Sequence, residues 1–87
     1  MADKEPLHVD VYFSSIIKKE PFRGRAVSVS SENDLGDFDV LSKHSNFISL
    51  IYNKLTIRTP KGKKLDYEFE RGVMKVKKNK VSVFLGL

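Results

Sequence analysis

The sequence predicts an all-β domain, and three observations support this prediction. Apolar residues recur at every second position in several segments, such as 65–69 and 81–85, which places one face of each strand in a core and the other in water. Turn-forming residues separate these segments at intervals of about 8 to 12 residues, a spacing typical of a β-sandwich or a barrel. The chain has 87 residues, 40% of them hydrophobic, which is enough for one small core in a single domain.

In the first half of the chain, strands are predicted where residues alternate and where apolar residues are dense. Residues 7–11 and 25–30 alternate, and a break at Pro21–Gly24 separates them. Residues 40–41 and 47–52 contain more apolar residues, so we expect two short strands that are more buried than the others.

In the second half, four alternating segments are separated by turn signals. The predicted strands are 55–57, 65–69, 74–76 and 81–85. The predicted turns are Thr59–Gly62, Arg71–Gly72 and Lys78–Asn79. Alternation with one wet face is typical of antiparallel sheets, so the whole chain is predicted to form about eight antiparallel strands.

The ends of the chain and its short apolar stretches give further expectations. Residues 1–6 are expected to be a flexible tail and residues 7–87 the folded domain. A short helix fits only at 13–19 or around 45–50, and neither segment is long enough to be stable alone. The longest apolar stretch, 47–52, is far too short to span a membrane, and no export signal is present, so we expect a soluble, cytoplasmic protein.

Charge is distributed unevenly along the chain. Residues 1–53 contain six basic and eight acidic side chains, whereas residues 54–80 contain ten basic and three acidic ones. The segment 32–39 contains four acids and no base. Two surfaces of opposite charge favour a partner that docks in one orientation. An equally weighted alternative is that the outward lysines only keep strand edges from aggregating.

Residues suited to catalysis, metal binding or cofactor binding are sparse. The chain has no cysteine, and its two histidines, His8 and His44, lie far apart in sequence, so a metal site is not expected. Asp37 and Asp39 would share a strand face, which suits a weak cation or an acid–base pair, although solvated acids are the more frequent meaning of this pattern. His44 lies among hydroxyls in segment 42–45, but no nucleophile elbow and no phosphate-binding loop occurs. We therefore expect no catalytic residue, no metal and no cofactor.

Nucleic-acid binding is the first alternative function, because small basic β-barrels hold phosphates with lysines and stack bases on aromatic rings. The lysines of segment 61–80 would supply the positive charge. Tyr67 and Phe69, however, alternate with three acids, so both rings are expected in the core and not on a surface where bases stack. We therefore expect no nucleic-acid partner.

The order of several short motifs is more specific than any single one. Gly36-Asp37-Phe38-Asp39 and the following residues 40–51 resemble the G-E-L/F-G-I-L/Y-P-G-H-A-P-L-L signature of the epsilon subunit of F-type ATP synthases. Residues 71–83 resemble that family's closing G-G-x-L-E-V-x-x-N-x-V-T-V motif, and the resemblance covers residues 7–87. The chain departs from the signature at Ser42-Lys43, where the family has Pro-Gly, and at Arg71, where it has glycine.

The resemblance implies a small β-sandwich of about eight to ten short antiparallel strands, without the family's C-terminal helical hairpin, because the sequence stops at Leu87. It further implies a non-catalytic domain of the central stalk that docks on the gamma subunit and the c-ring and couples proton transport to ATP synthesis at the inner membrane face. A second alternative is an epsilon-like sandwich recruited to another assembly. The implied site residues are Gly36, Asp37 and Phe38 toward the c-ring, and His44, Ser45 and Ser49 toward gamma.

Overall fold

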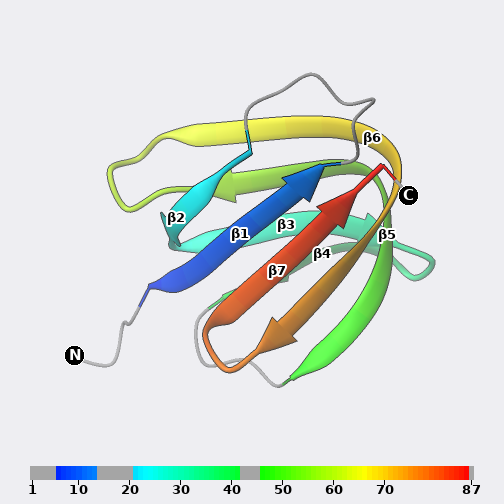
Figure 1. Cartoon of the computed structure of the whole chain (residues 1–87), viewed down its shortest axis with the longest axis horizontal. Helices are drawn as coiled ribbons and strands as arrows, with labels where there is room; N and C mark the ends of the chain where they lie inside the picture. Colours follow the sequence, from blue (N-terminus) through cyan, green and yellow to red (C-terminus); the bar gives the residue numbers. More distant parts are fainter. Residues whose placement is uncertain (1–5, 14–20, 42–45, 87) are drawn as a thin grey trace.

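The computed structural model describes residues 6–13, 21–41 and 46–86, and all regular structure in these segments is β-strand (Figure 1). The strands form one open sheet in the order β2-β1-β7-β6-β5-β3-β4. Every neighbouring pair is antiparallel except β1 and β7, which run parallel. The strands are β1 Leu7–Phe13, β2 Arg23–Ala26, β3 Ser28–Asn33, β4 Gly36–Val40, β5 Phe47–Arg58, β6 Lys64–Lys77 and β7 Lys80–Leu85.

The predicted all-β class is confirmed, but the described strands are fewer, and two of them are longer, than the sequence predicts. The segments predicted as separate strands at 47–52 and 55–57 form the single strand β5. The segments predicted at 65–69 and 74–76 likewise both belong to β6. In the helix candidate around 45–50, the residues from Phe47 belong to strand β5 and not to a helix. Residues 1–5 of the predicted tail and 14–19 of the other helix candidate lie outside the described residues.

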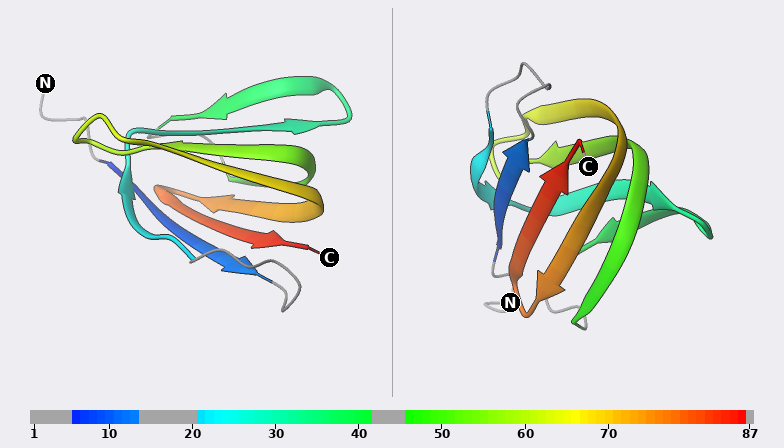
Figure 2. Two further views of the ribbon diagram at one scale, coloured as in Figure 1. Left: turned by 90° about the horizontal axis from the view of Figure 1, so that it is seen from above. Right: turned by 45° about the vertical axis from the view of Figure 1, so that its right-hand side comes forward.

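The sheet bends so that its two halves face each other, as the layers of a sandwich do (Figure 2). β3 pairs with β5 only at Leu55–Arg58, whereas β7 pairs with β6 only at Gly72–Lys77. The strands β5 and β6 therefore each run from one half into the other. We call the half with β1, β2, β7 and the segments 47–52 and 71–77 the β1 layer. The half with β3, β4 and the segments 53–58 and 64–70 is the β3 layer.

The bend between the layers coincides with an extra residue in β6. Between Tyr52 and Asn53 of β5, the strand pairing skips Glu70 of β6. An extra residue of this kind is a β-bulge, which bends the strand and increases its twist. The bulge also shifts the alternation of β6 by one residue, so that the inward residues are odd-numbered before it and even-numbered after it.

Gly72 lies just after the bulge, where the main chain of β7 comes very close. A Cβ atom at this position would lie 2.5 Å from the carbonyl oxygen of Phe84 and 3.0 Å from Cδ2 of Leu85. Only a residue without a side chain fits so near a neighbouring backbone. The predicted turn at Arg71–Gly72 is therefore wrong, because both residues lie inside β6 and the change in alternation marks the bulge.

One hydrophobic core fills the space between the two layers, and it consists of the inward-facing residues of both. Aromatic pairs connect the layers at its margins. Phe13 of β1 packs against Tyr67 of β6 with ring centroids 5.5 Å apart, and Phe38 of β4 meets Phe47 of β5 edge-on at 6.2 Å. The layers are thus fixed relative to each other by packing.

The two predicted turns that flank β6 are confirmed. In the β5–β6 turn, the N–H of Gly62 donates to the carbonyl of Thr59 at 3.0 Å, and Gly62 has a φ of 87°. In the β6–β7 turn, Lys78 adopts a φ of 56°, and its N–H donates to Oδ1 of Asn46 at 2.7 Å. This hydrogen bond ties the β6–β7 turn to the residue that precedes β5.

Candidate docking surfaces

The β3–β4 hairpin carries the acidic segment at one end of the molecule (Figure 1). Its loop is formed by Asp34 and Leu35, between the paired residues Asn33 and Gly36. The N–H of Leu35 donates to Oδ1 of Asn33 at 2.8 Å, and Gly36 has a φ of 118°, a conformation that favours glycine. Leu35 is 96% exposed. The hairpin therefore has a locally fixed tip that presents an apolar side chain among acids.

The residues predicted to face the c-ring point to different sides of this hairpin. Gly36 and Asp37 are exposed, and Oδ2 of Asp37 accepts a hydrogen bond from Nζ of Lys54 at 3.2 Å. Phe38 is half-buried and packs against Phe47 of the other layer. Phe38 thus anchors the hairpin, and the solvent-facing part is formed by Gly36 and Asp37.

Ser49, which is predicted to face gamma, lies next to the tip of the same hairpin. Its hydroxyl accepts a hydrogen bond from Nδ2 of Asn33 at 3.3 Å and donates to the carbonyl of Leu50 at 2.9 Å. The structure therefore places Ser49 close to the hairpin rather than on a distant flank. His44 and Ser45 lie outside the described residues.

The outer face of the β1 layer carries an exposed apolar row that the sequence analysis did not identify. Tyr12 pairs with Phe84, Phe84 with Val73, and Val73 with Leu50, so the four side chains cross β1, β7, β6 and β5 in line. We call these four residues the apolar row. Tyr12 and Phe84 stack with ring centroids 4.9 Å apart and remain 42% and 39% exposed, and Leu50 is 53% exposed.

A signal for the apolar row is present in the sequence. Each of its members stands next to a core residue in the chain, as in Leu50-Ile51 and Phe84-Leu85. Where both faces of a strand are apolar, alternation is lost, and the pattern resembles that of a strand buried on both sides. The prediction that segment 47–52 is more buried than the other strands is therefore wrong, because Leu50 and the neighbouring Ile48 face solvent.

The outer face of the β1 layer is also basic beside the apolar row. Lys80 pairs with both Lys77 and His8, and His8 pairs with Arg25, so these side chains form a second line across the layer. Lys75 lies between the two lines, opposite Ser82. The predicted basic sheet surface is therefore present, and further lysines lie in the β5–β6 turn at the end of the sheet.

The described residues contain little that is suited to chemical catalysis. No group of three or more His, Cys, Asp or Glu residues in 6–13, 21–41 and 46–86 could hold a metal ion. Two pKa values are shifted, and both have structural causes. A hydrogen bond from Nε of Arg23 to Oδ1 of Asp10, 3.0 Å long, raises the pKa of Arg23, and burial raises the pKa of Tyr67. Within the same residues, no helix is long and apolar enough to cross a membrane.

These features define a class: a two-layered all-β domain with candidate docking surfaces and a single core between the layers. Residues 16–85 match the family described as ATP synthase, Delta/Epsilon chain, beta-sandwich domain, and the chain belongs to that family. The resemblance to the epsilon subunit, noted from the motifs, is thereby confirmed.

Individual relatives agree with this assignment. The ATP synthase epsilon chain of Stenotrophomonas maltophilia (strain K279a) is 31% identical over 67 residues, which cover 76% of this chain and 48% of the relative. The epsilon chain of Xanthomonas campestris pv. campestris (strain B100) is 29% identical over 69 residues, or 78% of this chain and 49% of the relative. The chain thus spans about half the length of the curated relatives it matches.

Solved structures share the fold at lower sequence identity. A chain of the Euglena gracilis mitochondrial ATP synthase, solved as OSCP/F1/c-ring, superimposes with a TM-score of 0.75 at 19% identity over 92% of this chain and 50% of that chain. A chain of the Tetrahymena thermophila mitochondrial ATP synthase, solved as central stalk and c-ring, gives 0.73 at 12% identity over 97% and 66%. These likenesses support the β-sandwich fold.

Proposed function

We propose that this domain is a non-catalytic part of the central stalk of an F-type ATP synthase, where it docks on the gamma subunit and the c-ring and couples proton transport to ATP synthesis. Membership of the epsilon family supports this role. In the complex the domain lies on the cytoplasmic side of the inner membrane and is peripheral to it.

The observation that carries the proposal is the apolar row on the outer face of the β1 layer. Protein–protein interfaces are enriched in exposed aromatic and aliphatic side chains that lose water on docking, and their margins are polar. The row supplies a stacked Tyr12–Phe84 pair at one end, with basic residues beside the row. We assign this face to gamma, and we propose that His44, Ser45 and Ser49 contribute to the same contact.

The acidic hairpin suits the other contact, with the polar loops of the c-ring. Gly36 and Asp37 lie on its solvent side, while Phe38 holds it against the core. A polar contact of this kind orients two bodies without a large apolar interface. A rigid sandwich with one contact on a face and another at a tip can transmit rotation between its partners.

Two paired experiments test this role. The unmodified domain, mixed with gamma from the same organism, is expected to be retained in a pull-down, and the bulky replacement His44→Trp is expected to weaken retention. Failure of the unmodified domain to bind gamma would contradict stalk assembly. A parallel titration with single-stranded DNA at low salt is expected to show no binding, because Tyr67 and Phe69 face the core.

The c-ring contact is tested in the assembled synthase. Asp37→Lys reverses a charge at the tip, so ATP-driven proton pumping is expected to fall while gamma retention is unchanged. The matched control is Glu68→Lys, which makes the same charge change at an exposed position of β6, outside the hairpin and paired with Lys54 of β5. Equal effects of the two substitutions on pumping would show that the hairpin has no special role.

A further inference from the structure

The strand β2 leaves one of its edges open. It is the terminal strand of the sheet and pairs only with β1. The N–H of Val11 donates to the carbonyl of Phe22 at 2.8 Å, which marks this pair as hydrogen-bonded. Since hydrogen-bonded and non-bonded pairs alternate in an antiparallel ladder, the main-chain groups of Arg23 and Arg25 point away from β1.

The same alternation shows where the open edge ends. The N–H of Val27 also points away from β1, and it donates to the carbonyl of Arg58 at 2.8 Å. Among the described segments, no main-chain partner occupies this side of Arg23 or Arg25. The open edge is therefore short, and it offers the N–H and C=O groups of two arginines.

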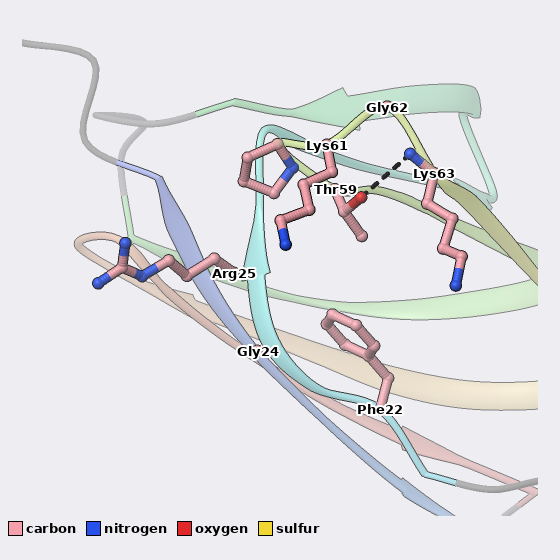
Figure 3. Close-up of a pocket in the computed structure, with 8 residues that line it drawn as sticks. Phe22, Gly24, Arg25, Thr59, Lys61, Gly62 and Lys63 are labelled. Atoms are coloured by element: carbon pink, nitrogen blue, oxygen red, sulfur yellow. Dashed lines mark hydrogen bonds between the residues drawn. The ribbon is translucent and has the colours of Figure 1, made fainter.

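A pocket of about 750 Å³ adjoins this edge, between β2 and the β5–β6 turn (Figure 3). Phe22 and Gly24 line one side, and the turn residues 59–63 line the other. In Figure 3 the ring of Phe22 points toward Thr59, with Lys61 and Lys63 on either side of it. None of the described residues that line the pocket is acidic.

Gly24 helps to keep this pocket open. It pairs with the buried residue Val9 of β1, at a position where a strand in a sandwich normally contributes a core side chain. A Cβ atom at Gly24 would lie 3.2 Å from Cζ of Phe22, and no other side chain lies that near. The pocket therefore exists partly because position 24 has no side chain.

The geometry points to a docking site for an extended acidic segment of a partner protein, which adds a strand to the free edge of β2 and inserts an apolar side chain beside Phe22. Main-chain hydrogen bonds to Arg23 and Arg25 hold such a strand, and a side-chain pocket selects its sequence. Successive side chains of the added strand point to opposite faces. Acids on one face therefore meet the arginines, while an aromatic or aliphatic residue enters the pocket.

The charge of the molecule favours a foreign segment over a second copy of this chain. β4 of another copy has the required pattern, Asp37-Phe38-Asp39, and is itself a terminal strand. However, Phe38 already packs against Phe47, and a formal charge of +5 makes two copies repel while it attracts an acidic peptide. Joining β2 to β4 between copies would also be a heterologous contact, which forms an open chain of copies unless its rotation closes a ring.

The test uses the whole chain and a synthetic peptide of alternating aspartate and phenylalanine, about seven residues long, the length of an ordinary strand. Calorimetry is expected to show binding, and amide NMR shifts are expected to change at residues 22–27 and 59–63. Methylation of the peptide nitrogens that face Arg23 and Arg25 is expected to abolish binding, whereas methylation of the alternate nitrogens is expected to preserve it. Equal effects of both methylation patterns would overturn the strand-addition proposal.

Variants of the chain separate this site from general attraction between opposite charges. Arg25→Glu and the double variant Lys61→Glu, Lys63→Glu are each expected to weaken peptide affinity by about tenfold or more. The control Lys77→Glu makes the same charge change on β6 and is expected to alter affinity by less than about twofold in ordinary salt. Gly24→Leu fills the pocket with a side chain. Its melting temperature is first compared with that of the unmodified chain, to confirm that the variant folds. Equal losses for Arg25→Glu and Lys77→Glu would overturn the proposal.

Ultracentrifugation of the chain alone decides whether the open edge of β2 takes a segment of a partner protein or β4 of a second copy. A monomer at all concentrations supports the partner segment. Association that disappears in the double variant Asp37→Lys, Asp39→Lys would identify β4 of a second copy as the occupant and overturn this assignment.

Discussion

The outer faces of the two layers differ in the side chains that they expose and in whether these side chains hydrogen-bond to one another. On the β3 layer, polar side chains pair with one another across the strands: Thr56 donates to Asp66 at 2.7 Å, and Ser30 donates to Asp39. On the β1 layer, the apolar row remains in contact with water. Polar groups that satisfy one another need no partner, whereas an exposed apolar row is stabilised when a partner covers it. The comparison therefore supports the proposal that gamma covers the β1 layer.

The largest expected effect, on stability, comes from a substitution at Gly72, beside the bulge where β6 bends between the two layers. In Gly72→Val, the new Cβ collides with the carbonyl oxygen of Phe84, at a distance of 2.5 Å. We expect the free energy of unfolding, measured in urea, to fall by about 3 kcal/mol or more.

Gly62→Ala is the control for this substitution. Gly62 has a φ of 87° and no atom within 4 Å of an added Cβ, so the cost is conformational only, about 1 kcal/mol. Equal losses at both glycines would mean that steric contact at Gly72 is unimportant.

A smaller effect, on binding rather than folding, is expected from Phe84→Ser. Phe84 is one of the two inner members of the apolar row, and its side chain is 39% exposed. Affinity for gamma is expected to fall by about tenfold or more, as for a central interface residue. The matched substitution Glu68→Ser lies at an exposed position of the β3 layer and is expected to change affinity by less than about twofold. If the two variants bind gamma equally, the contrast between the faces has no functional meaning.

The smallest effect concerns Tyr67, whose ring joins the layers through Phe13. Burial raises the pKa of Tyr67 above 10.0, so the folded state keeps the phenol neutral at a pH where the unfolded chain ionises. This contribution to stability is intact below pH 10 and is lost as the pH rises through the raised pKa. Relative to Tyr67→Phe, the unmodified chain is therefore expected to lose stability between about pH 9 and pH 11. A stability difference that is constant across this range would contradict a raised pKa.

The sequence predicts the strands well because alternation reports directly which face is wet. Residues 81–85 and 7–11 form strands where they are predicted. The sequence does not predict the joining of 65–69 and 74–76 into one strand. A bulge and a turn both interrupt alternation, and only the distance between Gly72 and the backbone of β7 distinguishes them.

The candidate docking surfaces are predictable only in part, because alternation within a strand does not report contacts between distant segments. The sequence locates an acidic segment at 32–39, and the structure places this segment on the β3–β4 hairpin. The apolar row consists of residues from four strands, and its members come together only through register. Ser49 likewise meets Asn33 through a contact between distant segments, which no local pattern reports.

The parallel pairing of β1 with β7 has a consequence for the order in which the molecule forms. Of the described strands, β1 leaves the ribosome first, and it can pair with β7 only after β7, the last of these strands, has been synthesised. Until then, β1 and β2 are a two-stranded ribbon with an uncovered apolar face, and such a ribbon is barely stable in water. The nascent chain therefore completes its fold late, and during translation its amino-terminal ribbon is the part most exposed to misassembly or in need of a chaperone.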